Sequence, residues 1–240
     1  MMDWGKTKTI FILTFLFLNL LLGYQIYMKQ SQSINESQWD GSSLDELRQA
    51  LSQRKIILNA TIPKEILEMH FLQVKENQLS EGKTLAKVKM PVENEVIESI
   101  AREKIANFEH YELDGVVSTE NHLVYNQIKD GFPYFNAKLE FQINQDGTIQ
   151  YSQRYFEVMN QGSDRQVVSS YTALRTLLDQ QLLPSEAIIT KIRLGYHGQT
   201  QQTSVQVLTP VWRISYQIEG KRDMIFVNAL TGAVEKALTY

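Results

Sequence analysis

The pattern of apolar and polar residues is most distinctive at the start of the chain, where Ile10 to Tyr27 contains no charged residue. About 18 to 20 helical residues at 1.5 Å each match a hydrocarbon core roughly 30 Å thick, so this run predicts a membrane-spanning helix. Lys6 and Lys8 precede it, and cationic residues beside a first span tend to stay in the cytoplasm. We therefore expect a single-pass cell-membrane protein whose N-terminus is cytoplasmic and whose chain beyond Lys29 is extracytoplasmic.

A cleaved signal peptide is the alternative interpretation of this start. Its apolar region would be about 7 to 15 residues long and would be followed closely by small residues. Here the bulky segment 24–28 follows the run, and the small pair Ser31 and Ser33 lies further along. The sequence therefore favours an uncleaved anchor, with flank and span at 1–29 and a polar linker at 30–43.

Asn19 places an amide in the middle of the predicted span, where lipid offers no hydrogen-bond partner. Two interpretations stay open, a polar contact with another membrane helix and a bond to its own helix backbone. Leu16, Asn19 and Gly23 are our candidate positions for contacts with a transmembrane partner.

Beyond the linker the apolar spacing alternates between helix and strand periods. Helical spacing occurs at 43–55, where Ser43 and Glu46 fit a capping box, at 92–108, and after Ser169 or Ser170 up to Pro184. Strand-like runs occur at 55–62, 68–75, 122–128, 134–143, 149–158, 187–196, 203–208, 211–218 and 224–229. We predict an α+β fold with antiparallel sheets and helices on one face.

The clearest local signal is a hairpin. Asp146-Gly147 supplies the positive φ angles of a tight turn, and the preceding strand alternates apolar residues at Ala137, Leu139 and Phe141 with polar ones. One face of this hairpin should be buried and the other solvated.

Two similar lobes are predicted from a faint internal echo between FNAKLEFQINQDGTIQ and DMIFVNALTGAVEKA. We place the first α+β lobe at 44–120 and a second, β-rich lobe at 121–240.

Charge and composition exclude several functions. Leaving out Lys6, Lys8, Lys29 and Asp3 reduces 24 basic and 27 acidic residues to 21 and 26, a net charge of about −5 beyond the anchor. Because nucleic-acid binding needs a basic stripe, we expect no nucleic-acid function. The absence of cysteine excludes disulfides, thiolate catalysis and thiolate metal sites, and suits an extracytoplasmic protein of a Gram-positive bacterium.

Catalytic and cofactor motifs are not found. The four histidines have no metal-ligand spacing, so we interpret each as structural. Gly82-Lys83-Thr84 lacks the upstream glycine of a phosphate loop and is interpreted as a surface turn. The carboxylates at 93, 95 and 98 are ordinary residues for a helix start, and no serine-nucleophile signature occurs. We predict no catalytic, cofactor-binding or metal-binding residue.

The start of the chain resembles the YycI family in the segment DWGKTKTIFI, residues 3–12, and in Phe17-Leu18-Asn19. PVWRI at 210–214 and FVNALTGAV at 226–234 also resemble PepSY-type repeats. The YycI resemblance implies a single-span regulator of an essential sensor histidine kinase that governs cell-wall metabolism, with a YycH-type membrane protein as partner. It implies no active site, and the doubled Met1-Met2 leaves the start codon open.

We therefore predict a non-enzymatic regulator that modulates the kinase through transmembrane and extracytoplasmic contacts. An extracytoplasmic cell-envelope enzyme or a PepSY-type peptidase inhibitor is the alternative, and a passive assembly scaffold is a third interpretation. The sequence leaves open whether the kinase is activated or inhibited, whether a small ligand is sensed, and the stoichiometry.

Overall fold

The structure is a computed structural model that describes residues 4–35, 41–65, 67–198 and 205–235. The chain divides into two compact units, Met1–Asp45 and Glu46–Tyr240, and each is described by itself.

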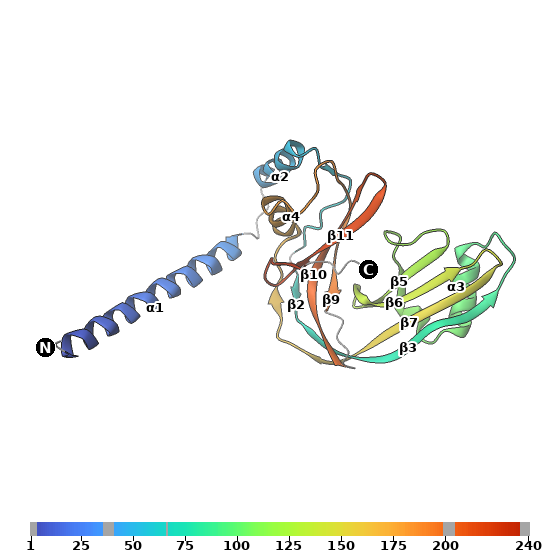
Figure 1. Cartoon of the computed structure of the whole chain (residues 1–240), viewed down its shortest axis with the longest axis horizontal. Helices are drawn as coiled ribbons and strands as arrows, with labels where there is room; N and C mark the ends of the chain where they lie inside the picture. Colours follow the sequence, from blue (N-terminus) through green and yellow to red (C-terminus); the bar gives the residue numbers. More distant parts are fainter. Residues whose placement is uncertain (1–3, 36–40, 66, 199–204, 236–240) are drawn as a thin grey trace. The chain divides into compact units, whose positions relative to one another are not determined.

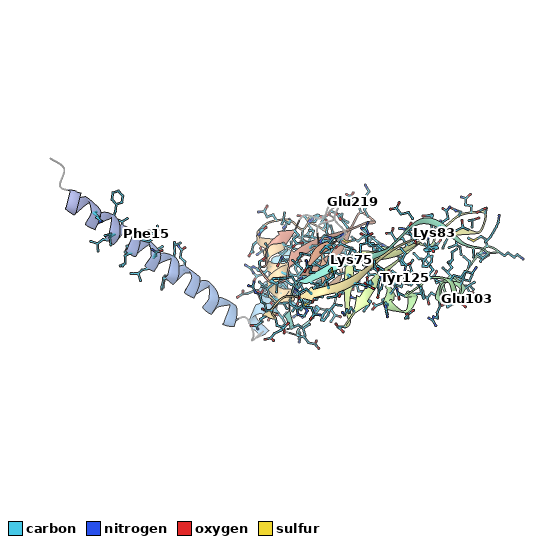
Figure 2. The ribbon with its side chains drawn as sticks, turned by 90° about the horizontal axis from the view of Figure 1, so that it is seen from below. Phe15, Lys75, Lys83, Glu103, Tyr125 and Glu219 are labelled. Carbon is cyan, nitrogen blue, oxygen red and sulfur yellow. The ribbon has the colours of Figure 1, made fainter. Side chains whose placement is uncertain are left out.

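The first unit contains one long helix, α1, from Trp4 to Asn35. The helix over residues 10–27 is thereby confirmed, and the ring of Phe15 projects from it with 67% of its surface exposed (Figure 2). Within the described part of the chain, no helix meets the combined length and hydropathy needed for a bilayer span. The membrane anchor at 1–29 stays a prediction. The helix also continues into the predicted linker 30–43, because nothing between Lys29 and Asn35 breaks it.

The second unit is built around one large sheet with few helices (Figure 1). Its helical elements are α2 (Gly41–Gln53, which starts in the first unit), α3 (Asn94–Lys104), η1 (Phe108–His110) and α4 (Ser170–Asp179). Its strands are β1 (Ile57–Leu58), β2 (Glu68–Met69), β3 (Leu72–Lys87), β4 (Tyr111–Leu113), β5 (His122–Lys129), β6 (Phe132–Ile143), β7 (Thr148–Gln161), β8 (Arg165–Gln166), β9 (Ile188–His197), β10 (Val205–Ile218), β11 (Lys221–Asn228) and β12 (Val234–Glu235).

The strands run in the order β1-β9-β10-β3-β7-β6-β5-β4, with β11 paired to β10 and β12 paired to β11. Most neighbours are antiparallel, while β1 with β9 and one contact of β6 with β9 are parallel. β2 and β8 form a separate pair. The α+β class with a large, mainly antiparallel sheet is confirmed.

One hydrophobic core forms where α2 and α4 pack against β9, β10 and β11. It contains Leu47 of α2, Leu174 and Leu177 of α4, and Trp212 and Ile214 of β10, all at most 1% exposed. Ser169 caps α4 by accepting a hydrogen bond from the Thr172 amide at 3.0 Å, which confirms the predicted start of this helix.

A second core lies between α3 and strands β5, β6 and β7. Ile97 and Ala101 of α3 pack with Leu139, Phe141 and Ile149, none of them measurably exposed. In the same core the Tyr125 side chain, labelled in Figure 2, donates from its hydroxyl to Glu98 Oε1 at 2.9 Å.

The hairpin at Asp146-Gly147 is confirmed. β6 pairs with β7 from Leu139 opposite Gln153 to Ile143 opposite Ile149. Gly147 has a φ of +80°, whereas Asp146 does not take the positive φ predicted for it. Each core draws on residues from both sides of position 120. The predicted lobe boundary at residues 120 and 121, and the likeness of the two lobes, stay predictions.

Three local predictions were wrong. α2 begins at Gly41, so Ser43 lies inside the helix and is not its cap. Gly82-Lys83-Thr84 belongs to strand β3, whose register shifts between Ser80 and Lys83, and Gly82 takes the positive φ of +58° at this irregularity.

The predicted break between strands 203–208 and 211–218 is also absent, because β10 is continuous through Pro210. β3 pairs with β10 as far as Leu208 and β11 pairs from Val211 onward. On its other side β10 stays paired with β9, with Pro210 opposite Tyr196. The Pro210 carbonyl faces β11, so its missing N–H lies on the side where β10 changes partner and removes no bond from the ladders to β3 and β11.

Candidate functional site

Three arginines form a row across the sheet on the face opposite the first core. Arg193 of β9, Arg213 of β10 and Arg222 of β11 lie on neighbouring strands, with Arg213 directly opposite Arg193. Side chains alternate along a strand, so Arg213 points away from the core that holds Trp212 and Ile214. We call these three residues the arginine row.

The arginine row holds the segment 112–118, which begins in β4 and belongs to the second core's side of the sheet. Arg193 donates from both terminal nitrogens to the Glu112 carboxylate, at 2.7 and 3.0 Å. Arg222 Nη1 donates to the carbonyls of Val116 and Ser118, at 3.1 and 3.0 Å. These contacts connect the first core to the second core through alternate residues of segment 112–118.

Arg213 and Asp114 form the central, buried pair of this joint. Arg213 is 3% exposed and Asp114 is 1% exposed. Arg213 Nη2 donates to Asp114 Oδ1 at 3.0 Å, and Nη1 donates to Oδ2. Asn126 Nδ2 also donates to Oδ2 at 2.7 Å, and the guanidinium lies 4.4 Å from the ring centre of Phe135. Paired, hydrogen-bonded charges of this kind are the form in which ions are tolerated inside proteins.

Burial by itself would raise the pKa of Asp114, but the hydrogen bonds and the charge of Arg213 outweigh it and hold this pKa below its ordinary value. The hydrogen bond from Arg193 likewise lowers the pKa of Glu112. Both carboxylates are therefore charged near neutral pH and stabilise the fold in that form.

We expect the free energy of unfolding to fall in acid because of these lowered pKa values. A carboxylate with a lowered folded-state pKa stabilises fully above its unfolded value, 3.8 for Asp114, and that contribution is lost as the pH falls through the folded value. Urea denaturation at pH 7 and pH 3 measures the loss. The Asp114→Asn variant should lose less between these two pH values than the wild type. An equal loss in both proteins would contradict the role given to Asp114.

Beside the arginine row lies an open cleft of about 890 Å³. Its wall includes six consecutive residues of β11, Lys221 to Phe226, together with Phe135, Val117 and both residues of β12. Concave, largely apolar sites of this size suit small ligands and peptide segments. The cleft is the main candidate for binding in this unit.

His197 and Glu235 lie at one end of the cleft. His197 Nδ1 is 3.6 Å from Glu235 Oε2, and its ring stacks on Phe226 with the two centres 4.3 Å apart. Burial would raise the pKa of Glu235, but the adjacent His197 and a hydrogen bond from Asn228 lower it. Across the described ranges, no group of three His, Asp or Glu side chains converges as metal ligands.

The candidate residues from the sequence all lie on α1, outside the Glu46–Tyr240 unit. Asn19 Nδ2 donates to the Phe15 carbonyl at 3.0 Å, which is one of the two interpretations left open for it. Leu16 is 56% exposed, Lys8 is exposed, and apart from the neighbouring residues and backbone of α1 no atom lies within 4 Å of a methyl group built on Gly23. Lys6 belongs to the helix, but its side chain lies outside the described residues. Their roles in orientation and partner contact stay predictions.

Sequence reasoning missed Asp114 and Arg213. The signal was present in Arg213, the one charged residue of its strand, between the apolar residues Trp212 and Ile214. Such a residue is almost never fully buried unless it is paired, so it should have prompted a search for a carboxylate.

Comparison with known proteins gives a family match and several solved structures, two of which are described below. The family model for YycI protein matches residues 82–230, well over half of the chain. No curated protein matches. An uncharacterized protein from Eubacterium rectale is 11% identical, with 82% of this chain and 81% of that chain covered and a TM-score of 0.41. The C-terminal domain of Bacillus megaterium YpeB is 15% identical, with 62% and 66% covered and a TM-score of 0.41. On the family match, the chain belongs to the YycI family, a family of regulators of the YycG-type sensor kinase system.

Proposed function

We propose that this chain is a non-enzymatic regulator anchored in the cell membrane by α1, with the Glu46–Tyr240 unit outside the cytoplasm. In this proposal the helix contacts transmembrane helices of the sensor histidine kinase, and the outer unit contacts a YycH-type membrane protein. The family match over residues 82–230 is the observation that carries the proposal. The uncharged run from Ile10 to Tyr27, preceded by Lys6 and Lys8, supports the anchor and its orientation.

The energy required of such a regulator is small. A protein that contacts two signalling states differently shifts their ratio tenfold for about 1.4 kcal/mol of differential contact energy. A few helix-packing contacts along α1 supply this amount.

The cleft of the outer unit favours binding over catalysis. Two of its carboxylates lie beside basic side chains, Asp114 beside Arg213 and Glu235 beside His197. The Asp114–Arg213 pair joins the two cores, so a reacting group there would have to leave a structural role.

Replacing Asn19 with leucine tests the helix contact. If Asn19 exchanges its bond to the Phe15 carbonyl for a bond across helices, the variant should lose about 0.6 kcal/mol of association, roughly a threefold change. In-cell crosslinking from position 16, followed by quantification of captured kinase, measures it. Gln25→Leu, which removes an amide from the end of the run, is the matched control and should leave capture unchanged. Unaltered capture and reporter output in Asn19→Leu would show that the amide bonds only its own helix.

A further inference from the structure

The outer edge of β11 is open along most of its length. β10 pairs with β11 on one side from Val211 opposite Asn228 to Ile218 opposite Lys221. On the other side β12 pairs only with Phe226 and Val227. In the part of the chain that the structure describes, Lys221 to Ile225 therefore has no strand on its outer side. These five residues also line the cleft of about 890 Å³.

The hydrogen bonds at the end of β11 show which backbone groups face this edge. The Ala229 amide donates to the Pro210 carbonyl in β10, whereas the Asn228 amide donates outward to the Ala233 carbonyl. N–H groups alternate between the two sides of a strand, and the ladder with β10 has no register shift. The amides of Arg222 and Met224 consequently point to the open side.

Asp223 covers one of these two donors. Its Oδ1 accepts from the Met224 amide at 2.7 Å, and its Oδ2 accepts from the Tyr216 hydroxyl at 2.9 Å. Proteins commonly protect sheet edges from unwanted pairing with charged side chains. Asp223 is a cover of this kind, and it can be displaced because its side chain is anchored by a single hydroxyl, that of Tyr216.

The side chains at the edge indicate the chemistry of an added strand. Met224 faces the cleft beside Phe135 and Phe226, so it favours an apolar neighbour. Arg222 lies on the same face, two residues away, and its described hydrogen bonds go to neutral carbonyls. Lys221 precedes it and is exposed, and within the described ranges no carboxylate pairs with either cation. An acidic residue suits this end of the edge.

We propose that the outer edge of β11, Lys221 to Ile225, accepts an extended segment of a partner protein as an added strand. That segment carries an apolar side chain opposite Met224 and an acidic side chain opposite Arg222. It continues in line with β12, and it takes over the Met224 amide from Asp223. Main-chain hydrogen bonds supply affinity and the alternate side chains supply specificity, as in other cases of strand addition.

This inference rests on the proposed function, which supplies the partner for the experiment. The tagged full-length chain is purified from membranes, and the amount of YycH-type protein recovered with it is measured. Met224→Pro removes the outward N–H without touching the ladder to β10, since that N–H does not point toward β10. Met224→Ala is the matched control, because it also loses the side chain but keeps the N–H. Recovery should be roughly three- to tenfold lower for Met224→Pro than for Met224→Ala.

Asp223→Ala gives an effect in the opposite direction. Without the Asp223 carboxylate the Met224 amide is free to bond an added strand, so recovery of the YycH-type protein should rise about two- to threefold. Urea denaturation of each variant checks that the fold is intact. If Met224→Pro unfolds the protein, the Asp223→Ala variant alone tests the proposal. Recovery of the YycH-type protein with Asp223→Ala at or below the wild-type amount then overturns the proposal.

Three outcomes separate the remaining interpretations. Equal recovery with folded Met224→Pro and Met224→Ala overturns the strand addition and leaves the proposed function standing. Ending the chain after Glu235 should preserve the difference between these two variants, and its disappearance would show that the chain's own last residues use the edge. If the wild-type chain recovers no YycH-type protein, the partner in the proposed function is wrong and the inference falls with it.

Discussion

Replacing Arg213 with leucine is expected to lower the free energy of unfolding by roughly 3–5 kcal/mol. The substitution leaves the Asp114 carboxylate buried, at 1% exposure, without the guanidinium that neutralises it. The hydrogen bond from Asn126 remains but carries no charge. Urea denaturation followed by circular dichroism measures the change.

The control for this prediction is an exposed arginine pair. Arg175 binds Asp179 one helical turn away in α4, with 41% and 59% of the two side chains exposed. Arg175→Ala should cost only about 0.3–0.5 kcal/mol, because solvent screens this pair. A loss below about 1 kcal/mol in Arg213→Leu would show that the buried pair contributes no more than a surface one.

The two-core arrangement explains why the loss should spread beyond one contact. Asp114 belongs to the segment held by the arginine row, and the same segment carries Glu112 and the carbonyls bound by Arg222. When Arg213 is replaced, Asp114 loses the charged contact that joins this segment of the second core to β10. The neighbouring contacts are exposed and contribute less each.

Local signals in the sequence predicted the hairpin at Asp146-Gly147, the Ser169 cap and the helix around Ile97 correctly. In each case the determinants lie within a few residues of one another, so one strand, turn or helix can be recognised from its own pattern. The α+β class followed from these elements.

The joint between the cores could not be predicted in the same way. Asp114 and Arg213 are 99 residues apart in the chain, and only the pairing of β9, β10 and β11 brings the arginine row opposite segment 112–118. Strand pairing of this range depends on the whole sheet and not on a local pattern. The predicted contacts of Leu16, Asn19 and Gly23 are with other chains, so they too depend on more than a local pattern.

The register of β3 and β6 could not be predicted from the sequence either, because the pairing of both strands contains irregularities. β6 pairs with β5 up to Lys138 opposite Asn126, then skips to Tyr134 opposite Gln127. It also pairs with β7 only from Leu139 onward. The residues of β7 after Gln153 therefore have no ladder to β6. Their backbone N–H and C=O groups that face β6 need other hydrogen-bond partners.

Gln127 supplies those partners, and replacing it with leucine is expected to cost roughly 2–6 kcal/mol of unfolding free energy. Its Nε2 donates to the Phe156 carbonyl and its Oε1 accepts from the Phe156 amide, both at 2.8 Å. Gln127 is 3% exposed, so the amide pair replaces a ladder step where water has little access. Leucine has a similar size but leaves two buried backbone groups of Phe156 unpaired, at about 1–3 kcal/mol each.

Gln142→Leu is the control for this prediction, because Gln142 lies in β6 with its side chain exposed and should change stability by less than about 0.5 kcal/mol. Amide hydrogen exchange adds a local measurement. The Phe156 amide should lose protection in Gln127→Leu, while the amide of Gln150, in the intact part of the β6–β7 ladder, should keep it. Retained protection at Phe156 together with wild-type stability would mean that β6 or water closes the gap when the glutamine is absent.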